Sequence, residues 1–158
     1  MEIYEEIKGL CHSAKTASYT LSQKSGAERN GALLEIAKAL RLSCADIISA
    51  NKLDLSKAKE NGISDAMLDR LMLNEQRVEG LATAIEHVVS LPDPIGTGSI
   101  FTRPNGLNIQ CVNVPLGVVA MIYEARPNVT PDAASLCLKS GNAVVLRGGK
   151  EAITHRSL

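Results

Sequence analysis

The chain has 158 residues, with 17 basic and 17 acidic side chains and 45% hydrophobic residues. This length and composition are typical of one globular domain with a core of ordinary size. The formal net charge of zero argues against nucleic acid or an anionic membrane as a partner, because both attract proteins with a basic surplus. Aromatic residues make up only 3% of the chain, which leaves few side chains for stacking on bases.

The start of the chain, residues 1–6, is acidic, whereas a secretory signal begins with basic residues. No apolar run reaches the roughly 20 residues that a membrane-spanning helix needs. We therefore expect a cytoplasmic protein without a membrane partner. The cysteines are widely spaced and form no Cys-x-x-Cys pair, so we expect reduced, mostly buried thiols and no metal site. They are Cys11, Cys44, Cys111 and Cys137.

The first half of the chain has the pattern of amphipathic helices. Apolar residues at helical spacing predict one helix over residues 3–22. Ser25 and Glu28 have the spacing of a capping box, which predicts the start of a second helix. The apolar stripe of that helix continues from Leu33 to Ile47.

Further helices are indicated up to about residue 90. A polar stretch ends at Asn61-Gly62, a pair typical of a turn or a helix C-cap. A short helix is expected after Ser64, and Asn74 has the right residue type to cap the next helix. Pro92 and Pro94 should end that helix, because proline cannot continue it.

Strand-like segments follow in the second half. Residues 96–106 are rich in turn-forming residues and predict a loop, and the alternation within residues 107–114 predicts a strand. Two continuous apolar runs, Val118–Tyr123 and Ala143–Leu146, are typical of strands buried on both faces of a parallel sheet.

Between these two runs lies a predicted helix. Thr130 can cap it, Pro131 suits its first position, and Ser140-Gly141 is a typical end. Strand, helix and strand within about 30 residues form a βαβ unit. We therefore predict an α/β fold, with a helical segment at residues 1–94 and a strand-rich segment at residues 95–158.

Two loops follow the carboxyl ends of the two predicted parallel strands, and ligands of open α/β sheets bind at such ends. In the first loop, Arg126 can hold a carboxylate or a phosphate, and Asn128 can donate to a developing oxyanion. The alternative is purely structural: Glu124 and Arg126 form a local ion pair, and Asn128 shapes the turn.

The second loop contains Arg147, Gly148, Gly149 and Lys150. The two glycines permit close approach of backbone amides to a ligand, and the two cations suit an anion. The alternative is a flexible turn with two solvated cations. Because both loops follow parallel strands of one unit, we expect them to line one crevice.

Two blocks of this sequence resemble the γ-glutamyl phosphate reductase family of the aldehyde dehydrogenase superfamily. They are residues 114–130, which contain Tyr-Glu-Ala-Arg-Pro-Asn-Val-Thr, and residues 139–152, which contain Leu-Arg-Gly-Gly-Lys-Glu-Ala. The chain departs from the family pattern at His155-Arg156, where Ser-Asn is usual.

The resemblance implies an aldehyde dehydrogenase-like fold with a Rossmann-like cofactor domain, of which this chain holds the first part. It also implies NADPH-dependent reduction of L-glutamyl 5-phosphate in proline biosynthesis, by a full-length enzyme that forms a homo-oligomer. The nucleophilic cysteine is then expected in a catalytic domain outside this chain. Implied substrate-binding residues are Glu124, Arg126 and Asn128, with Asn128 as the oxyanion stabiliser; implied NADP-binding residues are Arg147, Gly148, Gly149 and Lys150.

Two alternatives to this reductase stay open. One is a nucleotide- or anion-binding module without catalytic activity. The other is a different relative within the aldehyde dehydrogenase superfamily. The Glu-Ala-Arg-Pro-Asn loop argues against a simple aldehyde as substrate, because such an aldehyde offers nothing for Arg126 to bind.

Overall fold

The computed structural model describes residues 2–124 and 126–148. These residues form six helices and two separate two-stranded sheets. The helices are α1 (Glu2–Ser22), α2 (Gly26–Leu42), α3 (Cys44–Glu60), α4 (Asp65–Leu71), α5 (Glu75–Ser90) and α6 (Val129–Lys139). The strands are β1 (Gly98–Thr102), β2 (Asn108–Val112), β3 (Val118–Ile122) and β4 (Ala143–Arg147).

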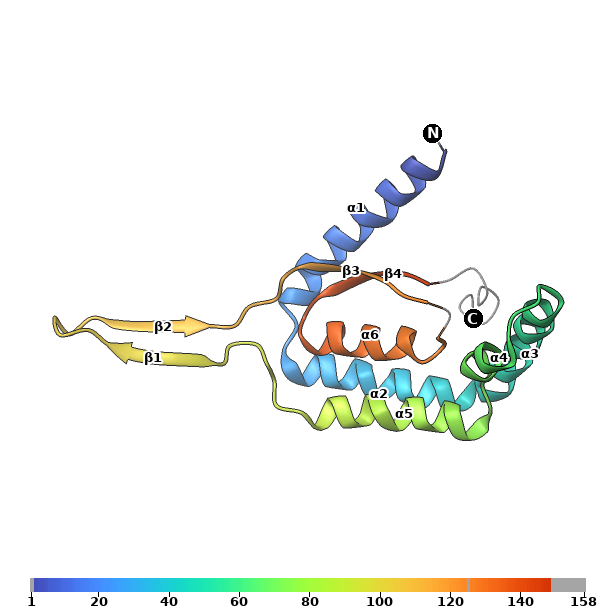
Figure 1. The fold of residues 1–158 in the computed structure, drawn as a ribbon. Coiled ribbons are helices and arrows are strands. Elements are labelled where there is room, and N and C mark those ends of the chain that lie inside the picture. Colours follow the sequence, from blue (N-terminus) through green and yellow to red (C-terminus); the bar gives the residue numbers. More distant parts are fainter. Residues whose placement is uncertain (1, 125, 149–158) are drawn as a thin grey trace.

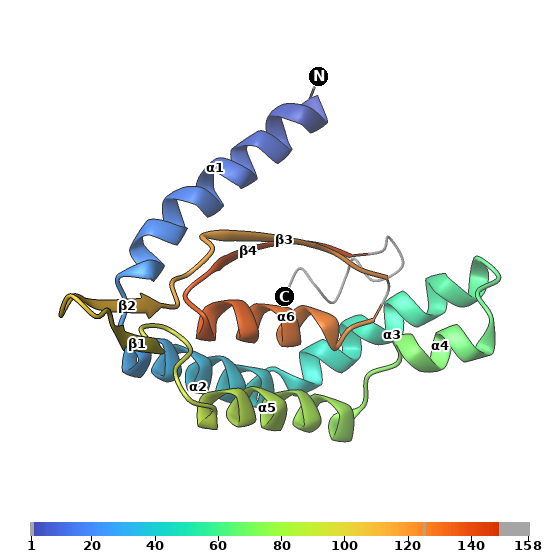
Figure 2. The same cartoon turned by 60° about the vertical axis from the view of Figure 1, so that its left-hand side comes forward.

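The elements form layers around helix α6. Helices α2 and α5 run side by side, and α6 packs against both of them (Figure 1). The parallel pair β3–β4 lies on the other side of α6 (Figure 2). The C-terminal part of α1 lies against the pair, and the N-terminal part of α1 projects away from it (Figure 2). The predicted βαβ unit and the α/β fold are therefore confirmed. None of the helices in the described part of the chain is long and apolar enough to cross a membrane.

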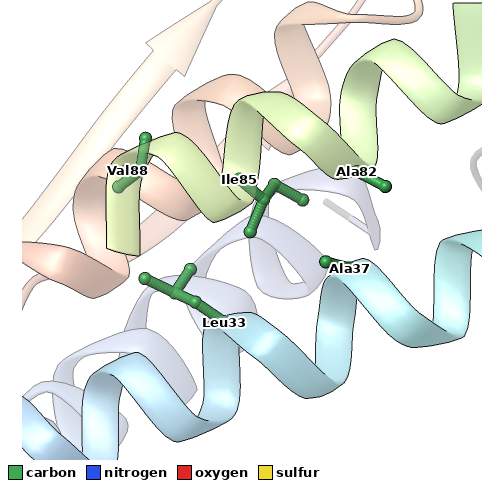
Figure 3. Packing of buried hydrophobic residues seen from close by; sticks show 5 residues of the cluster. All are labelled: Leu33, Ala37, Ala82, Ile85 and Val88. Atoms are coloured by element: carbon green, nitrogen blue, oxygen red, sulfur yellow. The ribbon is translucent and has the colours of Figure 1, made fainter. Parts of the chain in front are cut away.

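The main hydrophobic core lies between α2 and α5. Leu33 and Ala37 of α2 meet Ala82, Ile85 and Val88 of α5, and each of these side chains is buried (Figure 3). Leu138 of α6 packs against the same cluster. The small side chains in this cluster let the helix axes approach closely, and burial of the larger ones supplies about 1.5–3 kcal/mol each.

A buried arginine connects this helical layer to the βαβ unit. Arg29, which is only 3% exposed, donates from Nε to the Lys139 carbonyl at 3.1 Å and from Nη1 to the Lys24 carbonyl. Its Nη2 lies 2.8 and 2.7 Å from the two carboxylate oxygens of Asp93. Gly26 leaves room for that carboxylate, because a Cβ there would lie 2.2 Å from Asp93 Oδ2.

A second buried cation strengthens the same junction. The ammonium of Lys139, at the end of α6, donates to Asn30 Oδ1 at 2.9 Å and to the Val89 carbonyl at 3.0 Å. The C-terminal end of α6 is thereby held to both α2 and α5. Each buried charge has hydrogen-bond partners, as burial of a charge requires.

The predicted helix caps at Ser25 and Asn74 are confirmed. Ser25 Oγ accepts from the Glu28 amide at 3.2 Å, and the Ser25 amide donates to the Glu28 carboxylate at 2.8 Å. This backbone hydrogen bond and the bond from Lys24 lower the pKa of Glu28 to about 2. Asn74 accepts from the Arg77 amide at 2.8 Å, so α5 begins where the sequence indicated.

The predicted continuous stripe from Leu33 to Ile47 is wrong as one helix. Helix α2 ends at Leu42, and α3 begins at Cys44 after a single C-cap residue, Ser43. The Ser43 amide still donates to the carbonyl four residues before it, at 2.9 Å. Because the break takes one residue only, the hydrophobic period passes through it without a visible gap.

The polar residues before Asn61 belong to α3, which continues to Glu60. Its buried face includes Asn51, whose Nδ2 donates to the Leu71 carbonyl at 2.9 Å and whose Oδ1 accepts from the Leu73 amide at 2.7 Å. Asn51 thus supplies hydrogen-bond partners to two backbone groups after α4. Because asparagine is polar, a hydrophobicity pattern does not identify this position as buried. The predicted turn after this stretch is present, with Gly62 at φ 74°.

The loop predicted at residues 96–106 is wrong in part, because Gly98–Thr102 forms strand β1. It pairs antiparallel with β2, with Gly98 opposite Val112 and Thr102 opposite Asn108. Every residue of β1 is exposed, and the hairpin extends away from the helices (Figure 1). The residues of β1 do not alternate between polar and apolar, so no strand pattern marks them, whereas β2 lies within the predicted strand at residues 107–114.

The predicted start of α6 is also wrong, whereas its predicted end is confirmed. The N-cap is Asn128 rather than Thr130, and Pro131 is the third helical residue. Proline is tolerated there because the first four amides of a helix have no partner within the helix. At the other end, Gly141 has φ 71°, and the Asn142 amide donates to the Cys137 carbonyl at 2.8 Å, as in a Schellman motif.

Arg29→Met should lower the free energy of unfolding by about 2–4 kcal/mol. The carboxylate of Asp93, which is 39% exposed, and two backbone carbonyls lose a donor whose own side chain is only 3% exposed. Denaturant titration of the protein measures the loss. The control is Arg41→Met, since Arg41 also forms ion pairs, with Glu79 and Glu86, but all three of these side chains are at least 37% exposed, whereas Arg29 is buried. Equal losses in both variants would contradict the role of the buried arginine.

Gly141→Ala should destabilise the protein more than Gly62→Ala. Both glycines have nearly the same positive φ, 71° and 74°, so both substitutions carry a similar backbone strain of about 1–2 kcal/mol. A Cβ at Gly141 would also lie 2.7 Å from Ile95 Cδ1 and 2.9 Å from Pro115 Cγ, whereas nothing lies within 4 Å at Gly62. Thermal melts of the two variants compare them directly, and equal melting temperatures would show that the close contacts carry no cost.

Candidate functional site

The candidate site lies where β3 and β4 end. The two strands are parallel neighbours, with Val118 opposite Ala143 and Ile122 opposite Arg147. One further bond, from the Tyr123 amide to the Arg147 carbonyl at 3.0 Å, continues the ladder past β3. Because parallel strands end at one edge of a sheet, the loop after β3 and the start of the loop after β4 lie together. The two loops thus follow neighbouring parallel strands, as predicted. The common crevice stays a prediction, since Arg147 and Gly148 are not among the residues that line the cavity beside Arg126 and Asn128.

The loop after β3 is short and tightly turned. The Arg126 amide donates to the Glu124 carbonyl at 2.7 Å, and the Val129 amide donates to the Arg126 carbonyl at 3.1 Å. Pro127 is buried, whereas the side chains of Glu124 and Arg126 are exposed. These two described residues form no ion pair with each other, so the structural alternative considered for them is not realised here.

Two side-chain contacts fix the start of α6 relative to this loop. The hydroxyls of Tyr123 and Thr130 lie 2.6 Å apart. Asn128 is exposed, and its Nδ2 lies 3.4 Å from Asp132 Oδ2, near the upper limit for a hydrogen bond. The amide of Asn128 is therefore held only weakly and has donor capacity for a ligand.

The loop after β4 is described only at its beginning. Arg147, the last residue of β4, is exposed, and Gly148 is half-buried. An exposed cation at the carboxyl end of a parallel strand is available to an anionic ligand. Gly149 and Lys150, which complete the predicted cofactor-binding set, lie outside the described residues.

A cavity of about 490 Å³ borders the loop after β3. Arg126, Pro127 and Asn128 form one part of its lining. The remaining residues come from α4, the following turn and α5: Asp69, Arg70, Met72, Leu73, Arg77, Gly80 and Leu81. The structure thus brings together two segments that are about 50 residues apart in sequence.

Sequence reasoning missed the arginines of this second segment. One feature of the sequence could have drawn attention to Arg77. It lies in the first turn of a helix, where a cation interacts unfavourably with the helix dipole, so another interaction is expected to compensate. The structure shows the reason for its position, because Arg77 donates to the Asp69 and Met72 carbonyls at the end of α4, the latter at 2.8 Å. No comparable signal marks Arg70, which is an ordinary polar position on a short helix.

The cysteines differ from expectation, since only Cys137 is buried, Cys44 is intermediate, and Cys11 and Cys111 are exposed. Burial raises the pKa of the Cys137 thiol, which disfavours the reactive thiolate. None of the four lines the cavity beside Asn128. Within the described residues there is no group of three or more histidine, cysteine or acidic side chains that could hold a metal ion.

Comparisons with known proteins point to one enzyme family. A scan against protein-family models gave no match. A γ-glutamyl phosphate reductase of Clostridium perfringens is 60% identical over 148 residues, which are 93% of this chain and 35% of that protein. The crystal structure of γ-glutamyl phosphate reductase from Thermotoga maritima has a TM-score of 0.87 and 39% identity, and the match covers 91% of this chain and 35% of that one.

A more distant structure shows the fold. A probable aldehyde dehydrogenase from Listeria monocytogenes has a TM-score of 0.68 at 18% identity, over 96% of this chain and 31% of that chain. The predicted aldehyde dehydrogenase-like fold is therefore confirmed. The chain spans about a third of the length of the relatives that it matches. Across that third, this chain is homologous to the γ-glutamyl phosphate reductases.

Proposed function

We propose that this chain acts as part of a full-length enzyme that reduces L-glutamyl 5-phosphate with NADPH to L-glutamate 5-semialdehyde and phosphate. This reaction belongs to proline biosynthesis. The observation that supports the proposal is that Arg126 and Asn128 follow β3, and Arg147 ends β4, at the carboxyl ends of two adjacent parallel strands. The proposal is also supported by similarity, since the relatives that this chain matches over about a third of their length are γ-glutamyl phosphate reductases.

The proposed chemistry has two steps. A cysteine thiolate outside this chain attacks the acyl carbon of the substrate, so that a thioester forms and phosphate leaves. Hydride transfer to the thioester then gives the aldehyde and restores the thiolate. In both steps negative charge develops on the acyl oxygen, and a fixed N–H donor close to that oxygen lowers the barrier.

Asn128 is the proposed donor to the acyl oxygen. Its side chain is exposed at the strand end and lies only 3.4 Å from one acceptor, Asp132. The Tyr123–Thr130 contact and the turn at Arg126 keep the backbone around it in place. Such preorganisation is what makes an oxyanion donor effective. Arg126 and Glu124 are the proposed partners of the charged groups of the substrate.

NADPH is the proposed cofactor, and it supplies the hydride when bound. The residues proposed to hold it are Arg147, Gly148, Gly149 and Lys150. The exposed cation at Arg147, with glycine beside it, fits the phosphate groups of a dinucleotide. We further propose that residues 1–94 and 95–158 are the helical and the strand-rich segments of the cofactor domain.

The same proposal covers the setting of the full-length enzyme. On the family resemblance, we place it in the cytoplasm as a homo-oligomer with a small-molecule substrate and without nucleic acid as a partner. We propose that the nucleophilic cysteine is none of the four in this chain, since Cys137 is buried and none of the four is among the residues that line the cavity.

Arg126→Ala in the full-length enzyme should lower kcat/KM for L-glutamyl 5-phosphate. The expected decrease corresponds to about 2–4 kcal/mol of lost transition-state stabilisation, because a charged group of the substrate loses its partner. Consumption of NADPH in the presence of the acyl phosphate measures the reaction. Arg103→Ala is the control, since Arg103 is exposed beside the β1–β2 hairpin. Unchanged kinetics in Arg126→Ala would refute its role. NADPH binding without any turnover by the parent enzyme would favour the binding-module alternative.

Lys150→Glu should shift cofactor preference from NADPH toward NADH. A lysine attracts a 2′-phosphate, whereas a carboxylate repels it and accepts hydrogen bonds from ribose hydroxyls. A charge-assisted contact of about 1.5–3 kcal/mol corresponds to roughly one to two decades in preference. The ratio of kcat/KM values with the two cofactors measures the shift. A ratio within about twofold of the parent, far below one decade, would show that Lys150 does not select the cofactor.

A further inference from the structure

The cavity beside the loop after β3 has charged groups on two walls. Arg126 contributes from the loop, beside the neutral amide of Asn128, and Asp69, Arg70 and Arg77 contribute from α4 and the start of α5. Its volume of about 490 Å³ is within the usual range for a small-molecule site. The walls carry three cations and one carboxylate, so the cavity suits an anionic group together with a positive one.

The three arginines differ in what they already bind. Arg77 donates to the Met72 carbonyl at 2.8 Å and to the Asp69 carbonyl, and its Nη2 lies 3.1 Å from Asp69 Oδ1. Its guanidinium therefore stabilises the α4–α5 turn and orients the carboxylate of Asp69. By contrast, the side chains of Arg70 and Arg126 make no hydrogen bond or ion pair with another described residue.

Position assigns different tasks to the two unengaged arginines. Arg126 lies two residues before Asn128 in one tight turn, so it belongs with the acyl-phosphate end of the substrate. Arg70 lies on the wall formed by α4, next to Asp69 in the chain. A guanidinium fork pairs well with a carboxylate, and a carboxylate accepts well from an ammonium group. Both groups occur together on the α-carbon of an amino acid.

We propose that Arg70 is a specificity-determining residue that binds the α-carboxylate of the substrate, with Asp69 accepting from its α-ammonium group. This inference rests on the proposed function and adds the subsite for the amino-acid end. The helical segment then recognises the part of the substrate that does not react, while the loop after β3 holds the part that does. Such remote contacts raise catalytic efficiency by positioning the reacting carbon.

The test uses the full-length enzyme and three acyl phosphates. L-glutamyl 5-phosphate carries both α-groups, glutaryl phosphate carries the carboxylate alone, and butanoyl phosphate carries neither. Arg70→Gln should lower kcat/KM at least ~30-fold for L-glutamyl 5-phosphate and for glutaryl phosphate. This factor is the lower end of the range expected when one partner of a charge pair is removed. The same variant should stay within about threefold of the parent with butanoyl phosphate, which also shows that it is folded. Asp69→Asn should affect L-glutamyl 5-phosphate alone.

The control variant is Arg103→Gln, which removes an exposed arginine outside the cavity and should change none of the three values. If the parent reduces L-glutamyl 5-phosphate and Arg70→Gln lowers all three substrates equally, or none, the assignment of Arg70 is wrong and the proposed function stands. If the parent shows no reduction of L-glutamyl 5-phosphate by NADPH, the proposed function fails and this inference fails with it.

Discussion

The arrangement of the described structure depends on the buried guanidinium of Arg29. It joins the turn before α2, the C-terminal end of α6 and Asp93 behind α5 through hydrogen bonds to three different segments. An ion pair of this kind costs desolvation and adds little net stability, but removal of one partner leaves the other uncompensated. Its consequence is geometric: α6 has one permitted position on the α2–α5 layer, and the ammonium of Lys139 holds it there with two further bonds.

A fixed α6 in turn determines where the site residues lie. The Schellman motif at Gly141 leads into β4, and Asn142 Oδ1 accepts from the Gly117 amide at 2.8 Å just before β3. Both strands therefore start from one junction beside the C-terminal end of α6 and end together beside its N-terminal end. The loop with Arg126 and Asn128 has its place because the opposite end of the unit is anchored.

The sequence predicts those parts that depend on local rules. The caps at Ser25 and Asn74, the end of α6 at Gly141 and the two apolar strands each follow from residues a few positions apart. It does not predict β1, because the residues Gly98–Thr102 do not alternate between polar and apolar, unlike those of its partner strand β2. Nor does it predict that Arg70 and Asn128 line one cavity, because this arrangement follows from the packing of distant segments rather than from spacing along the chain.

Both halves of the chain line the candidate cavity. The loop after β3 contributes Arg126, Pro127 and Asn128, and the segment from α4 to α5 contributes the remaining lining residues. The α4–α5 turn forms one wall of this cavity, and Arg77 stabilises that turn by donating to the Asp69 and Met72 carbonyls at the end of α4. The polar residues of the helical half are thus not only a solvated surface. They shape a cavity whose chemistry is set jointly by both halves of the chain.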